Sequence, residues 1–186
     1  MAKVGKNIVT TGFSGKLGLI VFRNRAGKTF VSTAPEKKER ELTEAQKLHQ
    51  KEFQEAILYG QSIIADPATK AIYESRAEDG ESAFNVAVAD FMRAPSIDNI
   101  DVTRYNGKVG SSITVNAVDD FKVAEVQIAI YNADGSLVES GLAVQQANKA
   151  DWLFTATTAN SSLEGDKVVV RVTDKPGNLT QKEKAL

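Results

Sequence analysis

The chain has 186 residues, of which 42% are apolar and 25% charged, a composition typical of a globular protein. It contains no cysteine and one histidine, which excludes disulfides, thiolate chemistry, Cys-ligated zinc and any multi-histidine metal site within one chain. No apolar run approaches the roughly 20 residues of a membrane helix, and the first residues lead into no signal peptide. We therefore expect a protein made in the cytoplasm, without a membrane partner.

The formal net charge of −1 conceals an uneven distribution. Residues 1–40 contain nine Lys or Arg and two Glu, residues 41–94 contain five bases and ten acids, and residues 95–186 contain nine bases and twelve acids. The first acidic residue of the chain is Glu36. The sequence therefore attaches a basic N-terminal arm to an otherwise acidic protein.

Residues 7–34 have the composition of extended structure. Leu17 to Arg23 and Thr29 to Thr33 are rich in strand formers, which predicts a β-hairpin that turns through Asn24 to Lys28. As one strand, the first segment would be apolar on both faces, with Leu17, Leu19 and Val21 on one side and Ile20 and Phe22 on the other. Such a ribbon is not stable alone, so it needs cover from the helices, the second domain or another subunit.

The loop before this hairpin is rich in glycine and includes Lys16. Gly12, Gly15 and Gly18 are spaced as residues of tight turns. The loop lacks the strand–loop–helix context and the Gly-Lys-Ser/Thr order of a phosphate-binding loop, so we do not favour phosphate binding here.

Helices are predicted in the next section of the chain. Thr43 and Gln46 form a capping box for a helix to about Ala65, and Asp66-Pro67 caps a shorter one to about Arg76. A third runs from about Ser82 to Arg93 and stops before Pro95. His49 lies on the apolar stripe of the long helix, so we expect a hydrogen-bonded packing histidine rather than a catalytic one.

From Ser96 onward the hydrophobic period changes to two. Turn-forming pairs such as Asn106-Gly107 and Asp134-Gly135 separate the segments. About seven short strands in fewer than 100 residues are the pattern of a β-sandwich. The expected strands are Ile97–Tyr105, Ile113–Val118, Val123–Tyr131, Leu137–Leu142, Asp151–Thr157, Lys167–Thr173 and Leu179–Lys182.

The second half of the chain resembles bacterial Ig-like domains. The resemblance covers about residues 95–182 and rests on the segment from Ile113 to Asp120, Val123 and Val126, Trp152 with Phe154, and the segment from Val168 to Asp174 followed by Gly177-Asn178. It implies a non-catalytic sandwich used for adhesion, spacing or assembly. Single Ig-like modules on cytoplasmically made proteins also occur in phage capsids, tails and injection machines.

The predicted fold class is α+β, with a basic hairpin and three helices in residues 1–94 and an Ig-like sandwich in residues 95–186. The main functional hypothesis is a structural or assembly protein that is homo-oligomeric or binds a protein partner through its N-terminal half, with a virion or injection-machine component as one example. The alternative is nucleic-acid binding, in which Arg23, Arg25 and Lys28 neutralise phosphates and Phe13 or Phe30 stacks on bases. The expected interaction residues are Leu19, Ile20, Val21, Phe22, Arg23, Arg25, Lys28 and Phe30.

Acidic pairs occur at Asp79 with Glu81 and at Asp119 with Asp120. Both pairs fall in turns, where Asp is favoured by the backbone, and neither has the partner groups of an active site, so we expect no enzyme.

One ion site is predicted, without any other cofactor. Two turns at one end of an Ig-like sandwich would bring together Asp119, Asp120 and Asp174, with Asn178 nearby, and such oxygen ligands suit calcium. The alternative, which we favour, is that each Asp only caps its own turn.

Overall fold

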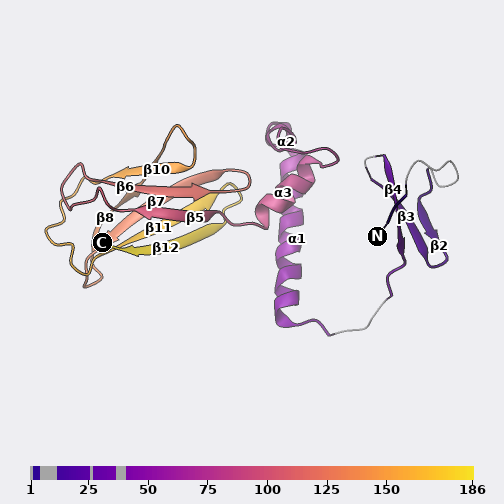
Figure 1. The fold of residues 1–186 in the computed structure, drawn as a ribbon, viewed down its shortest axis with the longest axis horizontal. Helices are drawn as coiled ribbons and strands as arrows, with labels where there is room; N and C mark the ends of the chain where they lie inside the picture. The colour runs from indigo at the N-terminus through magenta and orange to yellow at the C-terminus, as the bar shows by residue number, and fades with distance from the viewer. Residues whose placement is uncertain (1, 5–11, 26, 37–40) are drawn as a thin grey trace. The chain divides into compact units, whose positions relative to one another are not determined.

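The computed structural model describes residues 2–4, 12–25, 27–36 and 41–186. Over these residues the protein is α+β with mostly β content, comprising three helices and three antiparallel sheets (Figure 1). Its contacts divide the chain into two compact units. The first contains residues 1–55 and 60–86, and the second contains residues 56–59 and 87–186. The predicted boundary at residue 94 follows the third helix, whereas the second unit begins within it.

The N-terminal sheet has four strands in the order β1-β4-β3-β2. The segment predicted as one strand from Leu17 to Arg23 is divided in two by a tight turn at Gly18 and Leu19. Gly18 has φ +57°, a conformation that glycine adopts without the steric cost of a side chain. The strands are β1 (Ala2–Val4), β2 (Gly15–Leu17), β3 (Ile20–Arg25) and β4 (Lys28–Thr33).

This turn changes the predicted faces of the sheet. Leu17 is paired with Ile20 across the turn, and paired residues of an antiparallel sheet lie on the same face. The expectation that Leu17 and Ile20 lie on opposite sides is therefore wrong. The hairpin between β3 and β4 turns where predicted, since Arg25 pairs with Lys28.

The three helices begin where the sequence predicts. The capping box of α1 (Glu44–Ala65) is present, with Gln46 N donating to Thr43 Oγ1 at 3.3 Å and Thr43 N donating to Gln46 Oε1 at 3.0 Å. Asp66 caps α2 (Pro67–Glu74) by accepting a 3.0 Å hydrogen bond from Thr69 N. The last helix, α3 (Ala83–Phe91), ends two residues before the predicted Arg93.

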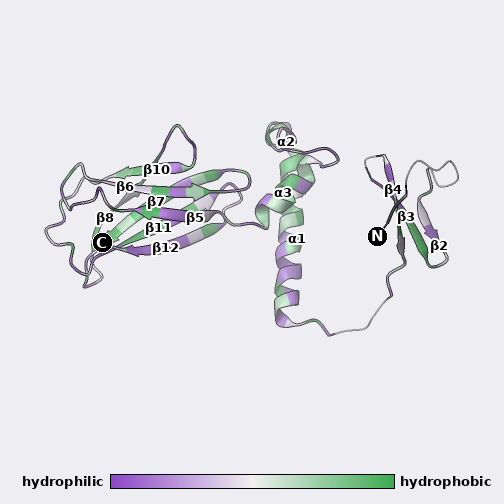
Figure 2. Cartoon of the chain, viewed as in Figure 1, coloured by the Kyte–Doolittle hydropathy of each residue, from purple (hydrophilic) through white to green (hydrophobic). Residues whose placement is uncertain are grey.

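The apolar stripe of α1 is buried only in its later turns. Ala56 and Ile63 are buried, whereas Leu48 and Phe53 are 58% and 48% exposed. In Figure 2 the first turns of α1 are mainly hydrophilic in colour. The predicted packing role of His49 is wrong, because its side chain is 70% exposed and its Nδ1 lies 3.9 Å from the Glu52 carboxylate.

Two further sheets form the C-terminal part, in the orders β5-β6-β10-β9 and β12-β11-β7-β8. All seven predicted strands are present, although the first ends at Asp101 rather than Tyr105, and a two-residue strand was missed. The strands are β5 (Ser96–Asp101), β6 (Ser112–Val118), β7 (Val123–Tyr131), β8 (Leu137–Leu142), β9 (Val144–Gln145), β10 (Asp151–Thr155), β11 (Lys167–Asp174) and β12 (Leu179–Ala185).

These two sheets share one hydrophobic core. The alternation in β6 turns Ile113, Val115 and Ala117 inward, and Trp152 of β10 joins them from the same sheet. The second sheet contributes residues of β7 and β11, including the fully buried Val170. Because both sheets pack on this core, it holds the ends of their strands, and the loops that join them, in defined positions. Among the helices described, none is both long and apolar enough to cross a membrane.

Candidate functional site

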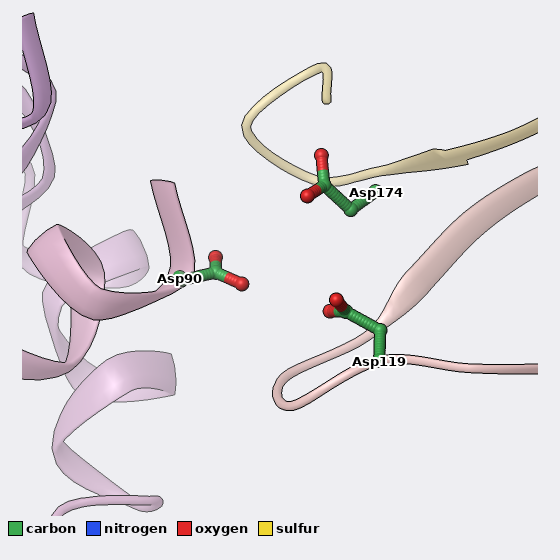
Figure 3. A group of neighbouring side chains, drawn as sticks. All are labelled: Asp90, Asp119 and Asp174. Atoms are coloured by element: carbon green, nitrogen blue, oxygen red, sulfur yellow. The ribbon is translucent and has the colours of Figure 1, made fainter. Parts of the chain in front are cut away.

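Three carboxylates form an acidic cluster in the second unit (Figure 3). It consists of Asp90 on α3, Asp119 just after β6, and Asp174 at the end of β11. One ligand oxygen from each residue lies within 4.8 Å of the others. Asp90 and Asp174 are each only 2% exposed. Buried carboxylates this close repel one another when ionised, so a cation or a proton stabilises the arrangement.

The loop after β11 holds the carboxylate of Asp174 in place. Its Oδ1 accepts hydrogen bonds from the backbone N–H groups of Gly177, at 2.8 Å, and Asn178, at 2.6 Å. Its Oδ2 accepts a 2.7 Å bond from the side-chain amide of Asn178, which also donates to Phe91 O at 3.0 Å. Asn178 therefore links the Asp174 turn to the C-terminal end of α3.

The environment of Asp174 disfavours its charged form. Burial raises the pKa of its carboxyl, and the nearby charge of Asp119 acts in the same direction. The hydrogen bonds from Asn178 and Gly177 lower this pKa but do not offset the burial. Any cation beside Asp174 would favour its ionised form.

Asp119 has a turn-forming role of its own. Its Oδ2 accepts hydrogen bonds from Phe121 N at 3.1 Å and from Lys122 N at 2.8 Å. This is the capping pattern that Asp commonly makes in a turn. The cluster thus combines ordinary turn chemistry with a geometry that could hold a metal ion.

The structure brings together only part of the predicted ion site. Asp119 and Asp174 converge, and Asn178 lies beside them as expected. Asp120 does not join them, because its carboxylate forms an ion pair with Arg93. Asp90 was not predicted from the sequence. A signal was present, because Asp90 follows the apolar Ala87 by three positions and so lies on the same face of a mainly apolar helix.

The N-terminal sheet is a second candidate site, because its two faces differ in chemistry. Its apolar face is formed by alternate residues and contains no charged side chain in β2, β3 or β4. Phe13 packs against this face, with its ring centroid 5.4 Å from that of Phe22. The face contains Gly15, Leu17, Ile20, Phe22, Asn24, Thr29, Val31 and Thr33.

The opposite face of the same strands, the basic face, carries all their charged side chains. Side-chain contacts agree with this division, since the paired Asn24 and Thr29 of the apolar face are hydrogen-bonded at 2.7 Å. The basic face contains Lys16, Val21, Arg23, Arg25, Lys28, Phe30 and Ser32.

The predicted interaction residues are therefore divided between three places. Ile20 and Phe22 lie on the apolar face, and Leu19 lies in the β2–β3 turn, 79% exposed. The remaining five are on the basic face: Val21, Arg23, Arg25, Lys28 and Phe30.

Comparisons with known proteins identify no family for this chain. No family model matches it, and no curated protein matches it. The crystal structure of CopC from Methylosinus trichosporium OB3b is 19% identical over 48% of this chain and 87% of its own, with a TM-score of 0.35. The crystal structure of an engineered protein is 14% identical over 59% of this chain and 30% of its own, with a TM-score of 0.32. These similarities are too weak to assign a function.

Proposed function

We propose that the protein is a non-catalytic assembly protein whose N-terminal sheet makes subunit contacts while its C-terminal sheets are displayed. The observation that carries this proposal is that no residue of β2, β3 or β4 is buried. Leu17 and Ile20 of the apolar face are 67% and 43% exposed. A small sheet with one apolar face needs a partner to be stable in water.

The partner we propose is a second copy of the same sheet. The apolar face has no charge in the described strands, so it can pack against its own copy without burying an unpaired ion. The basic face cannot do so, because its like charges would repel. Self-association through the apolar face would leave both basic faces exposed.

We further propose that the C-terminal unit is an Ig-like sandwich. The order β5-β6-β10-β9 corresponds to strands A-B-E-D of an Ig fold, and β12-β11-β7-β8 corresponds to G-F-C with one further strand. Ig-like modules serve many binding and assembly roles, so this assignment supports display rather than one named partner. A virion or injection machine is one assembly in which such a module would be displayed.

Light scattering after size-exclusion chromatography tests the assembly proposal on the full chain. Leu17→Ser should raise the dissociation constant of the oligomer roughly tenfold or more, because burying one leucine is worth about 1.5–3 kcal/mol. Leu19→Ser is the matched control, since Leu19 is the same residue type and is also well exposed, at 79%, but lies in the turn. A full chain that stays monomeric throughout a concentration series would contradict the proposal.

Deleting residues 1–34 provides an independent test. The truncated chain should be monomeric yet keep the emission of Trp152, the only tryptophan, which is buried in the core of the C-terminal sheets. If the truncated protein assembles as before, the N-terminal sheet is not the contact.

The acidic cluster supports a second candidate function, binding of a hard divalent cation, and we propose calcium. Calcium takes six to eight oxygen ligands in flexible geometry, and the cluster supplies three carboxylates, with water available for the remainder. Calcium bound to the folded state should raise the melting temperature of the full chain.

The calcium test has a matched control in the neighbouring residue. Asp119→Asn should abolish the calcium-dependent shift in melting temperature, whereas Asp120→Asn should preserve it because Asp120 pairs with Arg93 outside the cluster. An unchanged melting curve of the unmodified protein in millimolar calcium would leave these aspartates as turn formers.

A further inference from the structure

The basic face of the N-terminal sheet has a charge of one sign. Strand alternation places Lys16, Arg23, Arg25 and Lys28 on this face, and these are all the charged residues of β2, β3 and β4. No acidic residue precedes Glu36 in the sequence. Within the described part of the chain, none of the four cations forms an ion pair. Their charge is therefore available to an external anion.

An aromatic side chain lies among these cations. Phe30 of β4 is paired with Arg23 of β3, so the two side chains are neighbours on the basic face. Lys28 lies two residues before Phe30 on the same strand and face, and Arg25 is paired with Lys28. Phe30 is partly exposed rather than buried. The ring is accessible and has three cationic neighbours within β3 and β4.

We propose that this basic face binds single-stranded nucleic acid. Neighbouring strands are about 5 Å apart and alternate residues of one strand roughly 7 Å apart, so the four cations form a grid over which a phosphate backbone can run. Phe30 offers a platform on which an unpaired base stacks, and such stacking tolerates any base. We therefore expect little sequence preference and strong salt dependence.

The distribution of apolar residues favours nucleic acid over an anionic membrane. Membrane-surface elements bury apolar residues in the lipid while their cations contact the headgroups at the edges of the same surface. In this sheet Leu17, Ile20 and Phe22 are on the face opposite the cations. A lipid surface could engage only one face at a time.

This inference is independent of the proposed assembly, because self-association uses the apolar face. Leu17→Ser should weaken assembly and leave the intrinsic affinity of each basic face unchanged. An original chain that binds nucleic acid but stays monomeric would refute only the assembly proposal, and one that assembles but does not bind nucleic acid would refute only this one.

Fluorescence anisotropy of a labelled oligothymidine in low salt tests the proposal on the full chain. The logarithm of the association constant should fall linearly with the logarithm of the salt concentration, with a slope of about −0.7 for each neutralised phosphate. The double variant Arg23→Gln/Lys28→Gln should reduce the magnitude of this slope by about 1.4 and the affinity at least tenfold. The charge-matched control Lys108→Gln/Lys184→Gln, on the C-terminal unit, should change neither.

Two further variants separate the contribution of base stacking from that of charge. Phe30→Leu should weaken binding by roughly fivefold or more without changing the salt slope, because it removes the ring and no charge. Arg23→Lys/Lys28→Arg keeps both charges and should bind like the original chain, as expected if the charges rather than the particular side chains determine binding.

Three outcomes would overturn the proposal. One is no binding of the oligothymidine at low salt. Another is equal affinity of the Phe30→Leu variant, which would reduce the interaction to general attraction of a polyanion. The third is binding to phosphatidylserine vesicles but not to the oligothymidine, which would assign the basic face to membranes.

Discussion

The side-chain amide of Asn178 donates a 2.7 Å hydrogen bond to Asp174 Oδ2 and lies 3.0 Å from Phe91 O. Asn178 is in the loop that follows β11, whereas Phe91 ends α3, 87 residues earlier in the chain. One amide group therefore satisfies a buried carboxylate and a helix C-terminal carbonyl at the same time. The turn after β11 and the end of α3 depend on each other through this residue.

Asn178→Ala should destabilise the C-terminal unit by about 1–3 kcal/mol, because it leaves a buried carboxylate oxygen and a backbone carbonyl without this donor. Gln181→Ala is the control, since Gln181 only accepts an exposed bond from Arg171. Urea unfolding followed by Trp152 fluorescence measures both. Equal effects of the two substitutions would show that the Asn178 link is not important for stability.

Asp119→Asn should change how stability depends on pH. The pKa of Asp174 is raised in the fold, so its contribution to stability is greatest below its ordinary value of 3.8 and is lost as the pH rises through the folded value. Removing the Asp119 charge reduces this loss, and Asn can still accept from the N–H groups of Phe121 and Lys122. The variant should therefore gain stability over the original chain as the pH increases.

Urea midpoints across a pH series without divalent cations test this expectation. The difference between the variant and the original should vanish at low pH, where the carboxyls are protonated. A difference that is the same at every pH would show that repulsion between Asp119 and Asp174 is not its cause.

Local sequence signals predicted most of the elements, because their causes are local. Thr43 with Gln46, and Asp66 with Pro67, determine where helices begin through bonds within four residues. Strand periodicity located β6, β7 and β8 within one residue at each end. The division of the first hairpin at Gly18 was missed because apolar residues continue through the turn.

The candidate sites were only partly predictable because they depend on contacts between distant segments. Asp119 and Asp174 could be placed together from the expected order of strands, but Asp90 comes from a helix whose position the strand pattern does not specify. The basic face needed the register of β2, β3 and β4, and one misplaced turn moved Leu17 to the wrong side. Composition alone located the cations in the N-terminal arm.

Glu139 on β8 links that strand to the loop after β10, and its loss should destabilise the C-terminal unit. Its carboxylate accepts hydrogen bonds from Thr157 N at 2.8 Å and Thr157 Oγ1 at 2.6 Å. Burial raises the pKa of Glu139, but the bonds from Thr157 and Thr158 more than offset this and lower it overall. Its stabilising effect is present above its ordinary value of 4.5 and is lost as the pH falls through the folded value.

Glu139→Ala should therefore cost about 1–2 kcal/mol at neutral pH, and less in acid. Glu164→Ala, at an exposed position, should have little effect. Thermal unfolding at two pH values tests this, and a cost that does not fall in acid would contradict the ionised hydrogen bonds.

Gly107 and Gly110 offer a matched test of backbone packing in the loop between β5 and β6. Both have positive φ, +76° and +89°, so alanine is strained at either position, by roughly 1–2 kcal/mol. They differ in space, because a Cβ on Gly107 would lie 2.4 Å from Asn160 O, whereas a Cβ on Gly110 would meet nothing within 4 Å. Gly107 also accepts a 2.7 Å hydrogen bond from Asn160 N, so the two backbones cannot separate without losing that bond. We expect Gly107→Ala to destabilise the C-terminal unit by about 1–3 kcal/mol more than Gly110→Ala, the cost of overpacking against a backbone. Urea unfolding monitored by Trp152 fluorescence measures the difference, and equal effects would mean that the Asn160 loop yields without cost.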